Sequence, residues 1–505
     1  MRFAKFFTIL TACLGVITAC DQKTEQKPTV SAIDKSPHEL TRAIYSAHLQ
    51  LDPHLIKATP DAAPLRDLLV GLMRFNSAGD VVPAIAKEFF SDDNKNWLFI
   101  LDDQAKWSNG EAVIADDFVA SWQRLADKNN HSPLAHYLIY MGVENAKEII
   151  EGVRVSNELG VKALNAHTLQ IQLVQANPNF PKMLAHIALL PTYRGQKPEE
   201  YKFISNGDYR IKERSKTTLT LQSERTELAF QTVLYQLITT IQNPSRFDIV
   251  ENPLVSYTRN QIMLPRLCTY FYEFNFNDPV LKRKEVRQAI QAMLSPSQIA
   301  SGIGIANYFV LPKTMLENSE RPLPKSSAEQ ILHQIGIDAK SPVQISLTYD
   351  DQEPHNRIAT RIARKLGQSD LFRIDEQAVS WEELLAKRNT QQFQLIRSGW
   401  CADYSDPLSF LTMFHSSSPD NKSGYHNEMI NQSLEELQSA VLSKAEREQK
   451  IMSIVNELQK DVAILPLFQY QRRVTVLPDI QGIEMNNSSE VIYSKDLYRQ
   501  QKDAQ

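Results

Sequence analysis

Residues 343–399, VQISLTYDDQEPHNRIATRIARKLGQSDLFRIDEQAVSWEELLAKRNTQQFQLIRSG, contain the pattern that decides the fold. Apolar and polar side chains alternate over residues 343–349, which is the period of a half-buried strand. Isoleucine and leucine then recur every fourth residue at 358, 362 and 366 and predict an amphipathic helix. Pro354 suits the first turn of this helix, and Gly367 is expected to end it in the left-handed conformation.

The second half of the stretch continues the alternation of strand and helix. A strand is expected near residues 371–379, the sequence SWEE at 380–383 is a capping box that opens a helix, and residues 393–398 predict a third strand. Strand, helix, strand, helix, strand indicates an open, mainly parallel sheet. Ligands of such sheets bind beyond the carboxyl ends of the strands, which here means residues 399–403, GWCAD.

Patterns outside this stretch extend an α/β interpretation to the whole chain. Strands are expected around residues 169–173 and 219–221, and a helix after Asp116-Asp117. Residues 451–458 predict a long helix, with a strand at 462–470 behind it. Because single cores stop growing near ~250–300 residues, a chain of 505 residues is expected to form at least two lobes.

Composition excludes some classes of function. Hydrophobic residues make up 42% and charged residues 23% of the chain, as in ordinary globular proteins. The net charge of -4 gives no basic surface for nucleic acid, so no nucleic-acid partner is expected.

The amino-terminal segment has the layout of a secretory signal. Arg2 and Lys5 precede an apolar run that ends in Ile17-Thr18-Ala19-Cys20 and is too short to span a bilayer. We interpret residues 1–19 as a signal peptide, Cys20 as the site of lipid attachment and residues 20–37 as a flexible linker. A plain cleaved signal without lipid is the alternative.

Of the four cysteines, two are expected to remain as thiols in the mature chain. Cys13 leaves with the signal and Cys20 is modified, so Cys268 and Cys401 remain in an oxidising compartment. One disulfide is the natural prediction, and two buried free thiols are the alternative.

Motifs of catalysis are missing from the sequence. We find no nucleophile elbow, zinc-protease motif, phosphate loop or Cys-x-x-Cys, and Gly302-Ile303-Gly304 lacks the third glycine of a nucleotide site. The spacing of His48 and His54 matches no common metal motif. We therefore expect a protein that is not an enzyme and has neither cofactor nor metal.

Three segments resemble the periplasmic oligopeptide-binding proteins, family 5 of the extracellular solute-binding proteins. They lie at residues 105–127, 267–273 and 399–411, with weaker similarity from about 40 to 470. The resemblance implies a two-lobed periplasmic-binding-protein (Venus-flytrap) fold of type II with an extra accessory domain. The implied divisions are lobe I at residues 38–69, 194–267 and 471–505, accessory domain II at 70–193, and lobe III at 268–470.

The resemblance also implies a function. Such proteins capture short peptides or peptide-like ligands and deliver them to the permease of an ABC importer. We expect a monomer, tethered by lipid on the periplasmic side of the cell envelope, with the inner membrane favoured by Asp21 after Cys20. In the family, the cysteines that match Cys268 and Cys401 form a disulfide. The alternative is a receptor-like envelope lipoprotein that has lost uptake and acts as a sensor, adhesin or chaperone.

Matches to family positions supply the candidate ligand-binding residues. Asp403 matches the residue that pairs with the peptide amine, and Arg388, Arg397 and His355 match residues that meet its carboxyl terminus. Backbone hydrogen bonds to the peptide are expected from Gly399 and Cys401, with Thr59 in the facing segment, and side-chain pockets from Trp381 and Trp400. Each has a structural alternative: Arg388 favours a helix end, Asp403 starts a turn, and the tryptophans belong to a core.

The chain departs from the family pattern at several places. Leu134 stands where the family has a tyrosine, Lys57 stands where it often has an acid, and residues 217–251 are shortened. These departures indicate an altered ligand or a weakened site.

Overall fold

The computed structural model describes residues 36–500, except 37, 47, 58–61, 200–201, 240–245, 252, 254–259, 317–325 and 440–441. Cys20, the predicted signal and most of the linker lie outside the described residues, as does Thr59. Residues 36–505 form one compact unit. No helix within the described ranges is long and apolar enough to cross a membrane.

A mixed sheet runs through the described chain. Its path is β15 (Phe372–Val379), β14 (Val343–Asp350), β16 (Leu395–Cys401), β12 (Gln261–Phe274), β17 (Ile464–Val476), β11 (Ile249–Glu251), β1 (Glu39–Tyr45), β10 (Thr232–Ile238), β9 (Thr218–Gln222) and β8 (Arg210–Arg214), with β13 (Ile305–Ala306) beside β17. The α/β fold class predicted from the sequence is confirmed.

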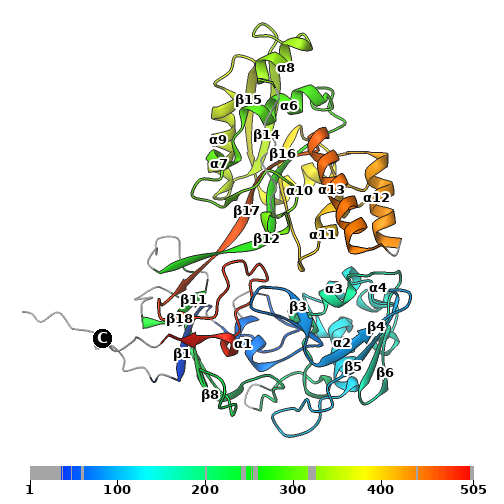
Figure 1. Cartoon of the computed structure of the whole chain (residues 1–505), viewed down its shortest axis with the longest axis vertical. Coiled ribbons are helices and arrows are strands. Elements are labelled where there is room, and N and C mark those ends of the chain that lie inside the picture. Colours follow the sequence, from blue (N-terminus) through cyan, green and yellow to red (C-terminus); the bar gives the residue numbers. More distant parts are fainter. Residues whose placement is uncertain are drawn as a thin grey trace, which may run out of the picture. The chain divides into compact units, whose positions relative to one another are not determined.

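The strand–helix alternation predicted for residues 343–399 is also confirmed. Strand β14 pairs in parallel with β15 and with β16, and helices α9 (His355–Leu366) and α10 (Trp381–Asn389) connect them. The apolar residues of α9 at 358, 362 and 366 are buried. In Figure 1, α9 lies beside β14 and β15.

Two local expectations need correction. Gly367 ends α9 with φ −69°, in the right-handed region, because its N–H continues the helical pattern by donating to the Ala363 carbonyl at 2.8 Å. At the start of α10 only half of the capping box is present. Ser380 Oγ accepts the Glu383 N–H at 3.1 Å, whereas the Glu383 carboxylate lies 3.7 Å from Lys387 one turn further on.

Strands β12 and β17 connect two sets of hydrophobic cores. Leu264 of β12 and Val474 of β17 belong to a core built from residues 40–264 and 474–497, to which Tyr404 also contributes. Further along the same strands, Phe274 and Leu465 belong to a core of residues 270–468. The β12–β17 register shifts between residues 265 and 269, where the strands pass from one core to the other. Two antiparallel strands are therefore the continuous connection between these cores (Figure 1).

The first core contains a second sheet, of four strands, and the helices around it. Its order is β4 (Ala86–Phe90), β5 (Asn96–Leu101), β7 (Thr168–Gln172) and β6 (Val161–Asn165). The apolar face of α2 (Ala115–Ala126) packs in this core through Phe118, Trp122 and Leu125, as the sequence pattern predicts. The other elements are α1 (Ala62–Leu68), α3 (His136–Tyr140), α4 (Ala146–Ile150), α5 (Phe180–Met183), the hairpin β2 (Met73–Phe75) and β3 (Val81–Pro83), and the pair β18 (Ile480–Gln481) and β19 (Tyr498–Arg499).

The remaining helices pack in the cores of residues 267–468. They are α6 (Lys284–Met293), α7 (Pro296–Ile299), α8 (Ala328–Gln334), α11 (Leu408–Leu411), α12 (Glu428–Ser439) and α13 (Lys444–Asp461). The four apolar residues that predicted a long helix near residue 451 are the buried residues of α13.

Candidate functional site

The carboxyl end of β16 has an open edge. Strand β14 pairs with β16 only at Leu395 and Ile396, whereas β12 pairs along its whole length to Cys401. A side chain at Gly399 would place Cβ 3.1 Å from the Thr269 carbonyl oxygen, so glycine keeps the strand close to β12. Residues 397–401 therefore have one paired edge and one edge without a strand partner among the described residues, which is the arrangement that an extended peptide can join.

A disulfide holds the end of this strand. Cys268 of β12 and Cys401 of β16 lie opposite each other in the strand register and are bonded, as the sequence predicts. The free-thiol alternative is excluded by this pairing. The bond links two strands next to the predicted ligand-binding residues.

Asp403 is an unpaired carboxylate just beyond β16. It is exposed to solvent and forms no hydrogen bond or ion pair with any residue that the structure describes. Partial burial nevertheless raises the pKa of its carboxyl group. A carboxylate without a partner in the described chain favours a ligand of opposite charge.

Two tyrosines of α3 lie near this carboxylate. Burial, and then the charge of Asp403, raise the pKa of Tyr140 to about 12, and the same two causes raise the pKa of Tyr137. Both belong to α3, which begins two residues after Leu134. Similarity to the family indicates a tyrosine only at the position of Leu134 and does not indicate these two. An aromatic surface beside a carboxylate can bind an ammonium group through ionic and cation–π contacts.

Arg397 and His355 form a second polar cluster. Arg397 Nη2 lies 3.2 Å from His355 Nε2 and donates to the Tyr470 hydroxyl at 3.4 Å. The His355 Nδ1 atom lies 3.2 Å from the hydroxyl of Tyr270. Burial, and then the charge of Arg397, lower the pKa of His355 to about 4, so its imidazole is neutral at pH 7.

The carboxylate of Asp350, which sequence reasoning missed, belongs to the same cluster. Asp350 Oδ1 lies 3.5 Å from Arg397 Nε, and Oδ2 lies 3.6 Å from His355 Nε2. Asp350 ends β14, and Arg397 lies on the neighbouring strand β16. Asp350 and Arg397 lie close together because β14 and β16 are adjacent in the sheet. The sequence predicts these strands but not the register that places the two side chains together.

Arg388 is engaged elsewhere in the protein. Its guanidinium donates to Glu273 through Nε at 2.9 Å and through Nη2 at 2.7 Å, and also to the Asp420 carbonyl. The side chain of Glu273 is 2% exposed. A bidentate, buried pair of this kind leaves Arg388 little capacity for a ligand carboxylate.

The two candidate tryptophans differ in their surroundings. Trp381 is 42% exposed, and its ring lies 5.5 Å from the Arg397 guanidinium carbon. Trp400 is half-buried and donates from its indole nitrogen to the Ser409 carbonyl at 2.6 Å. An exposed ring next to a candidate ligand-binding cation is suited to a side-chain pocket, whereas Trp400 also packs against a hydrophobic core.

Further contacts position the loop after β16. The buried carboxylate of Asp406 accepts from Lys182 of α5 at 2.7 Å and from Arg447 of α13 at 2.9 Å. The Leu408 N–H also donates to it, at the start of α11. These bonds join α5, α13 and the segment that carries Asp403.

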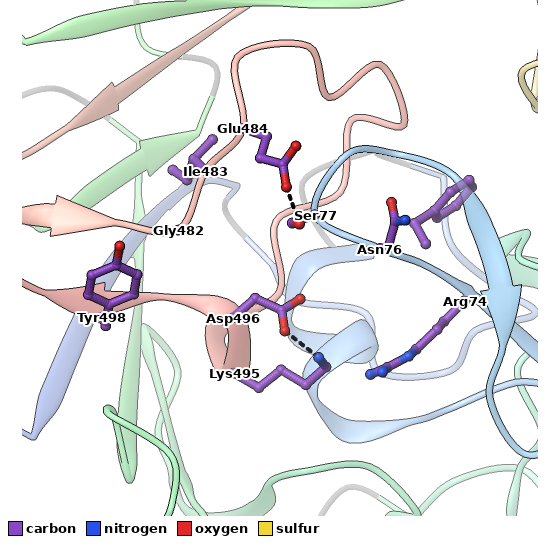
Figure 2. A pocket seen from close by; sticks show the side chains of 10 residues that line it. Arg74, Asn76, Ser77, Gly482, Ile483, Glu484, Lys495, Asp496 and Tyr498 are labelled. Carbon is purple, nitrogen blue, oxygen red and sulfur yellow. Dashed lines mark hydrogen bonds and ion pairs between the residues drawn. The ribbon is translucent and has the colours of Figure 1, made fainter.

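A separate cavity of about 530 Å³ lies between the β2–β3 hairpin and the carboxyl-terminal segment. Figure 2 shows Arg74 and Lys495 pointing into it, and the hydrogen bond from Ser77 to Glu484 closes one side. None of the residues predicted to bind a ligand lines this cavity. No group of three or more His, Cys, Asp or Glu side chains in the described chain is arranged to hold a metal ion.

Comparison with known proteins identifies the class. The family model described as "Bacterial extracellular solute-binding proteins, family 5 Middle" matches residues 80–226 and 219–422. A putative binding protein of Haemophilus influenzae is 40% identical over 97% of each chain. The chain therefore belongs to family 5 of the bacterial extracellular solute-binding proteins, which is a family of binding proteins rather than of enzymes.

The chain is also similar to named peptide-binding proteins and to solved structures. The periplasmic murein peptide-binding protein MppA of Escherichia coli is 28% identical over 97% of this chain and 98% of its own. The oligopeptide-binding protein OppA of Salmonella typhimurium is 29% identical over 89% and 90%. The unliganded open form of MppA superposes with a TM-score of 0.84 over 92% of this chain and 98% of that one, at 28% identity. Another structure of MppA gives 0.64 over 93% and 99%, also at 28% identity. The two-lobed type II fold predicted from the sequence is confirmed.

Proposed function

We propose that this protein captures short peptides or peptide-like ligands and delivers them to an ABC importer from a lipid anchor at Cys20. The observation that carries the proposal is the unpaired carboxylate of Asp403 beside the open edge of β16. Relatives named as murein peptide- and oligopeptide-binding periplasmic proteins support it. Membrane tethering and action as a monomer belong to the same proposal.

The ligand amine is assigned to Asp403. A peptide ammonium taken out of water needs an anion, because an unpaired buried charge is costly. Asp403 has no competing partner among the described residues, and Tyr137 and Tyr140 supply aromatic surface around it. The ammonium would pair with Asp403 and lie against these rings.

The ligand backbone is assigned to the open edge of β16. Main-chain hydrogen bonds at residues 399 and 401 fix the peptide without reading its side chains, which suits a receptor of broad specificity. Residues 397 to 403 span roughly 20 Å when extended at about 3.3 Å per residue. A ligand that contacts both ends is therefore a short peptide, and its far end lies near Arg397.

Closure of the two lobes is assigned to strands β12 and β17. Their irregular pairing near Pro265 provides a place where the strands can bend without breaking either core. A ligand favours the closed form only when it contacts both lobes, since it must bind that form more tightly than the open one.

The amine assignment is tested by titration calorimetry of the full-length protein in detergent, with trialanine and N-acetyl-trialanine. Trialanine is expected to bind at least tenfold more tightly, and Asp403→Asn is expected to abolish the difference. Asp370→Asn, which removes a charge from an exposed position in the same lobe, is the matched control and leaves the difference intact. Equal binding of the two peptides to the native protein would refute the assignment.

The anchor is tested separately. Cys20→Ser is expected to move the protein from the membrane fraction to the soluble fraction of the envelope. Retention of the variant on membranes would place the anchor elsewhere.

A further inference from the structure

The charges around Arg397 affect which ligand carboxyl ends the site favours. Arg397 is the candidate receptor for the far end of the ligand, and its side chain is 13% exposed. The carboxylate facing it, Asp350, is only 4% exposed. With His355 neutral at pH 7, the cluster holds one negative and one positive charge and has no net charge.

Asp350 and Arg397 lie close together, but one atom of each has no hydrogen-bond partner in the described chain. At 3.5 Å, Asp350 Oδ1 and Arg397 Nε attract each other but do not form a hydrogen bond, and both atoms are buried without another hydrogen-bond partner in the described chain. Arg397 Nη2 is occupied by His355 and Tyr470. Because Oδ1 of Asp350 is buried, Asp350 cannot contact a ligand directly. It therefore affects ligand binding by balancing the charge of Arg397.

Among the described residues, no further positively charged side chain contacts Arg397 or Asp350. Arg388, a second guanidinium near Arg397, is paired with Glu273. Arg266, which acts electrostatically on Tyr470, is paired with Glu490. The remaining groups packed on Arg397 are Tyr270 of β12, Tyr470 of β17 and Trp381 of α10, all uncharged at pH 7. A ligand carboxylate that approaches Arg397 consequently meets a guanidinium whose charge is already balanced.

We infer that Asp350 is a selectivity residue: by compensating Arg397, it makes this site accept peptides with a neutral carboxyl end about as well as peptides with a free carboxylate. The inference rests on the proposed function. Peptides with amidated or otherwise blocked carboxyl ends are then ligands of this protein. Without Asp350, the uncompensated guanidinium would favour the free acid, since opposite charges attract strongly in a partly buried site.

Calorimetry with trialanine and trialanine amide tests the inference. The native full-length protein is expected to bind the two within about threefold of each other. Asp350→Asn is expected to bind the free acid at least tenfold more tightly than the amide. Asp351→Asn removes the same charge from the adjacent, exposed position and is the matched control, for which the native ratio is expected.

A native protein that prefers the free acid by more than tenfold overturns the inference, even if Asp350→Asn does not fold. An Asp350→Asn protein that loses affinity for both peptides equally also overturns it, because that is the effect of a structural role alone. If neither peptide binds the native protein at any concentration tested, the proposed function fails and the inference fails with it. Binding with an unchanged ratio in the variant refutes the inference and leaves the proposed function intact.

Discussion

Arg388 donates two hydrogen bonds to Glu273, one residue lying on α10 and the other on β12. The contact ties a helix of the predicted ligand-binding region to the strand that connects the two sets of cores. It gives Arg388 a structural partner at a position that sequence similarity assigns to ligand binding. Arg388 and Arg397 thus each face a buried carboxylate, Arg388 through two hydrogen bonds to Glu273 and Arg397 at 3.5 Å from Asp350.

Removal of Arg388 is expected to destabilise the protein. Arg388→Ala leaves Glu273 buried without its partner, which costs about 3–5 kcal/mol in such pairs. The midpoint of thermal unfolding should fall, and the double variant Glu273→Gln/Arg388→Ala should recover part of the loss. A single variant as stable as the native protein would show that Ser398, which also donates to Glu273, is a sufficient partner.

The disulfide is expected to contribute substantially to stability. Cys268 and Cys401 are 133 residues apart, and chain-entropy estimates for loops of this length give about 4–5 kcal/mol. Reductant should lower the midpoint of thermal unfolding of the native protein. The double variant Cys268→Ala/Cys401→Ala should unfold at the lower temperature with or without reductant. A native midpoint unaffected by full reduction contradicts this account.

Acid sensitivity should depend on His54. This side chain is fully buried, and neither ring nitrogen has a hydrogen-bond partner among the described residues. Burial, and then the charge of Arg124, lower its pKa from 6.5 to about 3. Below pH 6.5 the unfolded chain takes up a proton that the folded protein refuses until about pH 3, so stability falls by up to about 1.4 kcal/mol per pH unit across this window.

The variant His54→Gln removes this proton uptake. Its thermal midpoint is expected to fall less steeply than that of the native protein between pH 6 and pH 4. His186, whose pKa burial also lowers to about 3, remains in both proteins and serves as an internal reference. Parallel curves for the two proteins would mean that His54 is not the group responsible.

Peptide binding is expected to weaken in acid because of Asp403. Burial raises the pKa of this carboxyl, and pairing with an ammonium would lower it again. Affinity for trialanine should be constant between the raised pKa and about pH 7, where the peptide amine is still charged, and should decrease as the pH falls through the raised pKa, by up to tenfold per pH unit. In Asp403→Asn the affinity should be lower and independent of pH. A native affinity that does not decrease at any acid pH at which the protein remains folded is incompatible with an ammonium bound at Asp403.

Local patterns predicted the elements, and long-range pairing decided their limits. The strand expected at residues 462–470 continues to Val476 as β17, although residues 471–473, QRR, are polar. They remain in the strand because Arg472 is buried against Glu251 and the Glu490 carbonyl, and β12 pairs alongside. Such partners lie far away in the chain, so no local window reveals them.

In the candidate site too, the sequence indicated individual residues but not their partners from distant parts of the chain. Similarity to the family indicated Arg388, Arg397 and Asp403 by position, and their charges followed directly from the sequence. Their acidic neighbours did not, because Glu273 lies 115 residues before Arg388. The two tyrosines of α3 were missed for the same reason, since only folding brings α3 near Asp403, which follows β16.

Native mass spectrometry of the full-length protein, released from detergent after purification from the cells that make it, tests the central claim most directly. The account predicts the bare mass together with a series of complexes, each heavier by the mass of one short peptide, and loss of the series in Asp403→Asn. A native protein that carries no peptide, and to which no member of an added mixture of di- to hexapeptides binds, would contradict the claim that it is a peptide receptor.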